Sequence, residues 1–137
     1  MSRTHKDSAV LYSQCYNTGN WELLETLLHP DFVYHSGRRG DLNKEELLAF
    51  LKSTKEAFPD GKFFIDDMVL QGDDLGIRHT FEGTMTGSIF GVEPSGKQAI
   101  QDVNEWVKFK GGLYIESWVI LNSFYLIQQL GIMPSPR

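Results

Sequence analysis

The pattern of hydrophobic and polar positions divides the chain near residue 61, with helical spacing before it and strand-like alternation after it. Before that point, polar residues that favour helix starts precede hydrophobic residues spaced three or four apart. The pattern predicts helices over residues 4–19, 20–28 and 43–58, with Pro30 closing the second helix, and a short β-like segment over residues 31–35. The third helix has the clearest buried stripe, formed by Leu47, Phe50, Leu51 and Phe58.

The second half of the chain predicts four strands, over residues 62–71, 75–85, 97–109 and 113–121. Residues typical of turns separate them, with a Gly-Asp-Asp, a Gly- and Pro-bearing segment and a Lys-Gly-Gly between successive strands. Helices followed by an antiparallel meander indicate an α+β fold. We expect one domain over residues 1–137, in which the curved sheet wraps around the N-terminal helices and closes into a cone with an internal pocket.

Composition and charge exclude several other classes. The chain has 137 residues, 41% hydrophobic and 23% charged, with a net charge of −5. The acidic balance argues against nucleic acid or an anionic membrane as the main partner, because both require clustered Lys and Arg. Cys15 is the only cysteine, so no intrachain disulfide is expected. The N-terminus has no apolar signal core and residues 118–127 are too few to span a membrane, so we expect a cytoplasmic protein.

Several short motifs carry a resemblance to a known family. They are Gly-Thr-Met-Thr-Gly at residues 83–87, Gly-Val-Glu-Pro-Ser-Gly at 91–96, Gly-Gly-Leu at 111–113, Trp118 with Asn122, and Gln-Leu-Gly at 129–131. In these the chain resembles the SnoaL-like polyketide cyclases, small cone-shaped proteins of the nuclear-transport-factor-like superfamily. The resemblance covers nearly the whole chain. It implies an enzyme without metal or cofactor that closes a polyketide ring by intramolecular aldol addition.

Glu105 is the strongest candidate for the proton transfers that such a reaction needs. Period-two alternation places it on the same side of its strand as Val103, Val107 and Phe109. A carboxyl among apolar neighbours has its proton affinity shifted toward neutrality, which suits a general acid or base. The alternative is that a bulge or a slipped alternation turns Glu105 outward into solvent.

Two histidines are further candidates. His35 ends the short β-like segment, where many relatives place polar residues at the pocket mouth, and it is either the partner of Glu105 or an exposed loop histidine. His79 shares a face with Ile77, Phe81 and Met85 by alternation, and is either a functional residue or a satisfied core histidine. The four histidines show no spacing typical of metal ligands.

The chain also departs from the family pattern. Met85 stands where relatives often carry His, and Met cannot transfer protons. Val119 and Asn122 stand at the two positions, directly after Trp118 and four residues after it, where relatives carry an Asp. Asn122 can hold a carbonyl by hydrogen bonding but cannot act as an acid or base. The acid/base apparatus of the aldol cyclases is therefore not intact in this sequence.

From these residues we expect a cofactor-independent cyclase or isomerase acting on a hydrophobic, carbonyl-containing small molecule. Glu105 would be the acid or base, His35 its partner and Asn122 a hydrogen-bond donor. The expected pocket walls are Met85, His79, Phe81, Trp118, Val119, Val103 and Phe50. The alternatives are a cofactor-less hydroxylase or hydrolase on the same scaffold, and a non-catalytic module that binds lipophilic ligands or dimerises.

The residues expected on the outer face of the sheet predict a homodimer. Strict alternation leaves three residues of each of the last two strands facing outward: Asn104, Trp106 and Lys108, and Tyr114, Glu116 and Trp118. Aromatic residues exposed among polar ones are common in interfaces. Trp118 belongs either to this face or to the pocket wall, depending on whether a bulge interrupts its strand.

Overall fold

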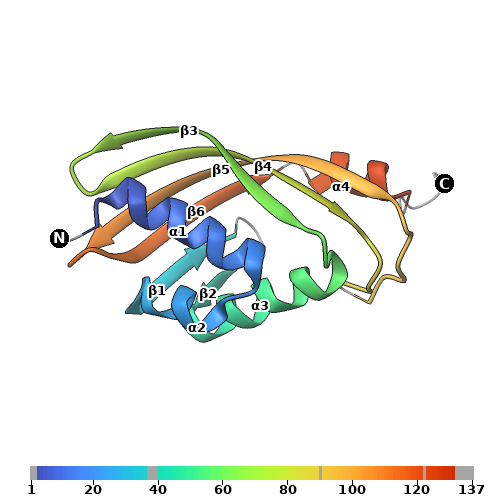
Figure 1. Cartoon of the computed structure of the whole chain (residues 1–137), viewed down its shortest axis with the longest axis horizontal. Coiled ribbons are helices and arrows are strands. Elements are labelled where there is room, and N and C mark those ends of the chain that lie inside the picture. Colours follow the sequence, from blue (N-terminus) through green and yellow to red (C-terminus); the bar gives the residue numbers. More distant parts are fainter. Residues whose placement is uncertain (1–2, 37–39, 90, 122, 132–137) are drawn as a thin grey trace.

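The computed structural model describes residues 3–36, 40–89, 91–121 and 123–131, which form four helices and six strands (Figure 1). The helices are α1 (His5–Thr18), α2 (Trp21–Thr26), α3 (Lys44–Ala57) and α4 (Ser123–Leu130). The strands are β1 (Leu28–His35), β2 (Asp41–Asn43), β3 (Lys62–Gln71), β4 (Asp74–Thr84), β5 (Gln98–Lys110) and β6 (Leu113–Leu121). The α+β class and the four long strands are confirmed.

All six strands belong to one curved sheet in the order β2-β1-β6-β5-β4-β3. Neighbouring strands are antiparallel except β1 and β6, which pair in parallel. The helices α1, α2 and α3 lie on the concave side of the sheet, and α4 lies at the far end against β5 (Figure 1). The sheet wraps around the N-terminal helices as predicted. The expected closure is wrong, because β2 and β3 remain unpaired edges of an open sheet.

Local chemistry sets the helix boundaries. The side chain of Thr4 accepts a hydrogen bond from the Asp7 backbone, and Asn43 does the same for Glu46, so capping boxes start α1 and α3. Gly19 ends α1 in the left-handed conformation with φ 75°. The second helix ends at Thr26 rather than Leu28, because Leu28 already pairs with β6. None of the helices over the described residues is long and apolar enough to cross a membrane.

Register decides which side chains face the helices. Along β5, alternate residues from Ala99 to Phe109 point to the concave side, and Asn104, Trp106 and Lys108 point to the convex side as predicted. The pairing of β5 with β6 shifts by one residue beyond Lys108. This bulge turns Tyr114 inward, where it is 1% exposed. The expectation that Tyr114 faces outward is therefore wrong.

The buried hydrophobic side chains form two clusters on the concave side. The larger one joins α1, α2 and α3 to β1, β4, β5 and β6, and includes Tyr16, Leu47 and Tyr114. The smaller one joins the end of α3 to Met85 and to Leu130 of α4. Val103, only 6% exposed, belongs to neither cluster and lies on the inner face of β5. The inner wall around Val103 is where the buried polar residues gather.

Candidate active site on the concave face

Three polar side chains surround Val103 on the inner wall. In the pairing of β4 with β5, His79 lies opposite Val103, Ile77 opposite Glu105, and Phe81 opposite Gln101. Residues paired across antiparallel strands point to the same face, so His79, Gln101 and Glu105 all face the helices. The prediction that Glu105 points inward agrees with this register, and no bulge interrupts β5 between Gln101 and Glu105.

Glu105 is a desolvated carboxyl. Its side chain is 8% exposed, and its strand neighbours on the inner face are Ile77 and Val119. Burial raises the pKa of the Glu105 carboxyl from 4.5 to about 7. The acid and carboxylate forms are therefore present in comparable amounts near neutral pH, which suits a group that both takes and returns a proton.

His79 is the nearest charged or polar partner that the structure gives Glu105. Its Nε2 lies 3.6 Å from Glu105 Oε1, too far for a hydrogen bond. Burial lowers the pKa of His79 from 6.5 to about 4, against a smaller opposing effect of Asp66. His79 is thus a neutral imidazole near pH 7, with one N–H donor and one acceptor nitrogen. The two residues do not form an ion pair at that pH.

Tyrosine rings extend the same wall. Tyr12 of α1 stacks on Tyr114 of β6 with ring centroids 5.1 Å apart. Burial raises the pKa of both phenols well above 10, and the negative charge on Glu105 raises it further. Both phenols therefore stay protonated and remain hydrogen-bond donors. These tyrosines were not singled out in the sequence, because their place beside Glu105 depends on the bulge in β6 and on how α1 docks.

His35 lies on the opposite face of the sheet from Glu105. On β1, Tyr34 pairs with inward-facing Ser117, so the next residue, His35, points to the convex side with its partner Trp118. There His35 stacks on Trp118 with ring centroids 5.0 Å apart. The expectation that His35 is the partner of Glu105 is therefore corrected by the register. His79 occupies that position instead.

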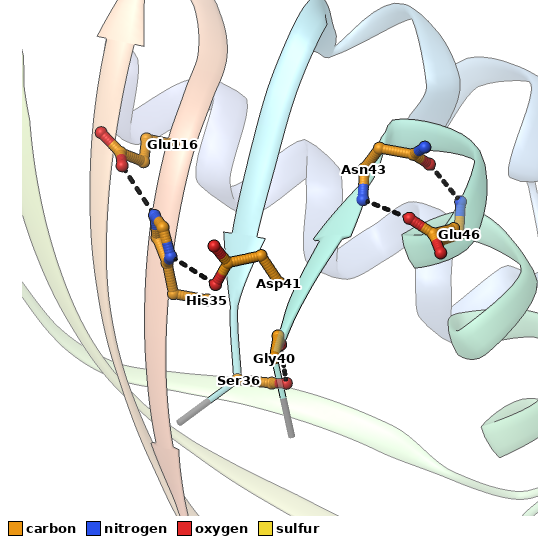
Figure 2. A network of polar contacts seen from close by, with 7 residues as sticks. All are labelled: His35, Ser36, Gly40, Asp41, Asn43, Glu46 and Glu116. Atoms are coloured by element: carbon orange, nitrogen blue, oxygen red, sulfur yellow. Dashed lines mark hydrogen bonds and ion pairs between the residues drawn. The ribbon is translucent and has the colours of Figure 1, made fainter. Parts of the chain in front are cut away.

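The side chain of His35 links three strands, β1, β2 and β6, through polar contacts (Figure 2). Its Nδ1 lies 2.8 Å from a carboxylate oxygen of Asp41 on β2, and its Nε2 lies 2.6 Å from Glu116 on β6. A neutral imidazole has only one N–H, so donating to both carboxylates requires the imidazolium form. Burial lowers the pKa of His35, but the hydrogen bonds to Glu116 and Asp41 outweigh it and leave the pKa raised.

The other predicted wall residues divide into three groups. Val103, Phe81 and Val119 face the concave side, with Val103 and Val119 beside Glu105, and Phe50 is half-buried on α3 against the larger cluster. Met85 is fully enclosed in the smaller cluster, away from Glu105. Trp118 faces the convex side, so its expected place in the pocket wall is corrected. Asn122 lies outside the described residues.

Two hollows lie along β3 and β4. One, of about 220 Å³, is bordered by Lys62, Phe64 and Glu82. The other, of about 300 Å³, is lined by residues that include Gly76, Arg78 and Glu105. The register turns Lys62, Phe64 and Arg78 away from the helices. Neither hollow is the expected internal pocket, although Glu105, whose pKa is raised by burial, belongs to the lining of the second one. Among the described residues, no group of three or more His, Cys, Asp or Glu could hold a metal ion.

Comparison with known proteins gives one family and one fold. The model of the SnoaL-like polyketide cyclase family matches residues 6–130. No curated protein sequence matches the chain. IdmH from Streptomyces antibioticus, a proposed polyketide cyclase, has a TM-score of 0.84 at 26% identity, covering 94% of this chain and 99% of its own.

Two further solved structures share the fold. TsrD from Streptomyces laurentii has a TM-score of 0.86 at 24% identity, covering 97% of this chain and 99% of its own. AclR from Streptomyces galilaeus, a proposed hydroxylase, has a TM-score of 0.85 at 22% identity, covering 97% of this chain and 88% of its own.

Proposed function

Because the chain belongs to the SnoaL-like polyketide cyclase family, we propose that it is a cofactor-independent cyclase or isomerase for a hydrophobic, carbonyl-containing small molecule. The substrate binds in an internal pocket on the concave face. Glu105 moves the proton. The observation that carries the proposal is a single carboxyl, 8% exposed on an apolar wall, whose pKa is raised by burial to about 7.

The chemistry requires little else. A carboxylate removes a proton from a carbon flanked by carbonyl groups, and the carboxylic acid so formed returns a proton to the developing alkoxide or to another carbon. A desolvated carboxylate is a stronger base than one in water, and burial here acts in that direction. The protonated phenols of Tyr12 and Tyr114 supply donors for negative charge that develops on a carbonyl oxygen.

One observation favours a second candidate, a binding module for lipophilic ligands. Val119 lies directly opposite Glu105 on β6 and contributes only an apolar side chain. It stands where the resemblance places the acid/base Asp of the aldol cyclases. Catalysis by this chain therefore depends on Glu105 replacing that residue.

The experiment that tests the proposal starts from the purified protein. Native mass spectrometry, followed by extraction of what is bound, identifies the ligand class. The Glu105→Gln variant then keeps the shape of the side chain but cannot take up a proton. We expect its turnover of that ligand to fall by about 10²–10⁴, the usual contribution of general acid–base catalysis. Turnover equal to wild type contradicts the role of Glu105, and equal binding without turnover in either protein favours the binding module.

We also propose that the convex face joins two copies of the chain. Large hydrophobic side chains are exposed there on three strands, β3, β5 and β6: Phe64 47%, Val69 70%, Ile100 49%, Trp106 48% and Ile120 73%. Large apolar side chains exposed on one face are typical of protein interfaces. Sedimentation of wild type should show a dimer, and Ile120→Lys should produce a 15.6 kDa monomer. Val10→Lys, at an exposed hydrophobic position on α1, is the matched control.

A further inference from the structure

The inner wall carries buried hydrogen-bonding groups that the proton transfer by Glu105 does not use. His79 is 8% exposed and Gln101 is 3% exposed. Both ring nitrogens of His79 and Nε2 of Gln101 are enclosed and have no hydrogen-bond partner. Buried polar atoms in native proteins are almost always paired, because an unpaired one destabilises the fold. Three such atoms on two neighbouring side chains offer hydrogen bonds to a bound molecule.

The register places both side chains within reach of one small molecule at Glu105. His79 lies opposite Val103, and Gln101 and Glu105 are two residues to either side of Val103 on β5. Gln101 and Glu105 are thus diagonal neighbours of His79 on the same face, where such positions are about 7–8 Å apart. Val103, which packs in neither hydrophobic cluster, forms the floor between them.

We propose that His79 and Gln101 are positioning residues that hold carbonyl oxygens of the substrate and so place its acidic C–H against Glu105. The assignment of the proton transfer rests on the proposed function, whereas the binding of carbonyl groups does not. Gln101 offers an amide N–H₂ and His79 one ring N–H, and both are donors that a ketone or ester oxygen accepts. The sequence alone predicts neither residue as a carbonyl donor.

The distances select a class of ligand. Nε2 of His79 is 3.6 Å from Glu105 Oε1. A carbonyl oxygen bound to His79 therefore places its neighbouring carbon within the close approach that proton transfer needs. A second carbonyl bound to Gln101 lies on the other side of Val103. An apolar molecule with two carbonyl groups satisfies both donors, and the carbon next to the carbonyl bound by His79 lies against Glu105.

The test uses two probes of equal shape, acetylnaphthalene and isopropenylnaphthalene, in which a methylene group replaces the carbonyl oxygen. Affinity is measured for each, together with the infrared C=O stretch of the bound ketone. We expect wild type to prefer the ketone by about tenfold, as one to two hydrogen bonds allow. The probe has one carbonyl oxygen, so at least one of Gln101→Leu and His79→Phe should reduce that preference by threefold or more and move the C=O stretch toward its value in an apolar solvent.

Conservative and control variants separate positioning from folding. His79→Gln retains an N–H donor and should restore most of the preference and of the infrared shift. Ser117→Ala removes another buried, unpartnered polar atom of the inner face, on β6, and should change neither readout. If His79→Phe does not fold, Gln101→Leu, which loses a donor, can still be compared with His79→Gln, which keeps one.

Two results overturn the inference: a wild type that does not prefer the ketone, and an unchanged preference in both Gln101→Leu and His79→Phe. The Glu105→Gln variant distinguishes this failure from that of the proposed function. It should lose turnover while keeping the ketone preference. Full turnover by Glu105→Gln, with the preference lost in either positioning variant, contradicts the role of Glu105 and leaves that of His79 and Gln101 standing.

Discussion

Replacing Glu105 with Gln should make the protein more stable, and by an amount that grows with pH. In the folded protein the carboxyl keeps its proton up to about pH 7, whereas in the unfolded chain it ionises near 4.5. Between these values the unfolded state releases a proton that the folded state retains. The free energy of unfolding of wild type therefore falls as the pH rises through this window. The Gln side chain does not ionise, so the free energy of unfolding of Glu105→Gln does not fall for this reason.

The raised pKa sets the size of the effect. Each unit of pKa difference is worth about 1.4 kcal/mol, so the shift of Glu105 corresponds to about 3 kcal/mol. The side chain is 8% exposed, so solvent screening reduces this little. The advantage of Glu105→Gln over wild type should increase by about 3 kcal/mol between pH 4 and pH 8. For a domain of this size that corresponds to a rise in Tm of roughly 10 °C.

Urea unfolding followed by tryptophan fluorescence, at pH values from 4 to 8, measures the difference directly. Other groups titrate in both proteins, so their contributions cancel to the extent that Glu105 does not affect them. Glu25→Gln, at an exposed position of α2, is the control and should show no such growth with pH. A stability difference that stays constant with pH, or that turns against Gln as the pH rises, would mean that the carboxylate is stabilised inside the protein. That result refutes the description of Glu105 as a desolvated acid.

Three further substitutions test other parts of the structure. His35→Phe should lower stability by roughly 1–2 kcal/mol at pH 6, from loss of charge-assisted hydrogen bonds; the loss should shrink as the pH rises through the raised pKa of His35, as unfolding at pH 6 and pH 9 would show. Gly87→Ala should destabilise by roughly 1–3 kcal/mol, because the added Cβ would lie 2.5 Å from the Glu56 carbonyl oxygen; Gly76→Ala, whose nearest contact is 3.8 Å, should show little loss in the same thermal melt. Asn43→Ala should cost about 1 kcal/mol in urea unfolding by removing the capping box of α3.

Most of the sheet was predictable because it depends on local patterns. The ends of β3 and β6 were predicted from alternation and turn residues, and those of β4 and β5 to within one residue. By contrast, β2 has three residues, too few for a period to be recognised. The parallel pairing of β1 with β6 joins segments about 80 residues apart, and local periodicity carries no information about such a pair.

The side of the sheet on which a candidate residue lies was likewise predictable only where local alternation determines it. Glu105 was predicted inward because three apolar residues share its face, and the same alternation also places Gln101 there. The sequence therefore does carry a signal for the inward position of Gln101. His35 follows three consecutive apolar residues, so alternation alone does not give its side; the packing of Tyr34 decides it. Trp118 faces outward, as strict alternation predicts, whereas the bulge between Tyr114 and Glu116, which no turn residue marks in the sequence, changes the side of Tyr114.

The destabilisation caused by burying Glu105 favours a catalytic role over ligand binding alone. A protein that only binds lipophilic ligands gains nothing from an ionisable group whose burial destabilises the fold by about 3 kcal/mol at neutral pH. Gln would bind a carbonyl equally well and would remove the destabilisation. A buried ionisable group that destabilises the fold is commonly retained where it takes part in a reaction. The desolvation that makes a carboxylate unfavourable also makes it a stronger base. The neutral His79, 3.6 Å away, does not neutralise that charge as an ion pair would. The wall around Val103 therefore keeps Glu105 reactive and leaves the two donors beside it free for the carbonyl groups of a substrate.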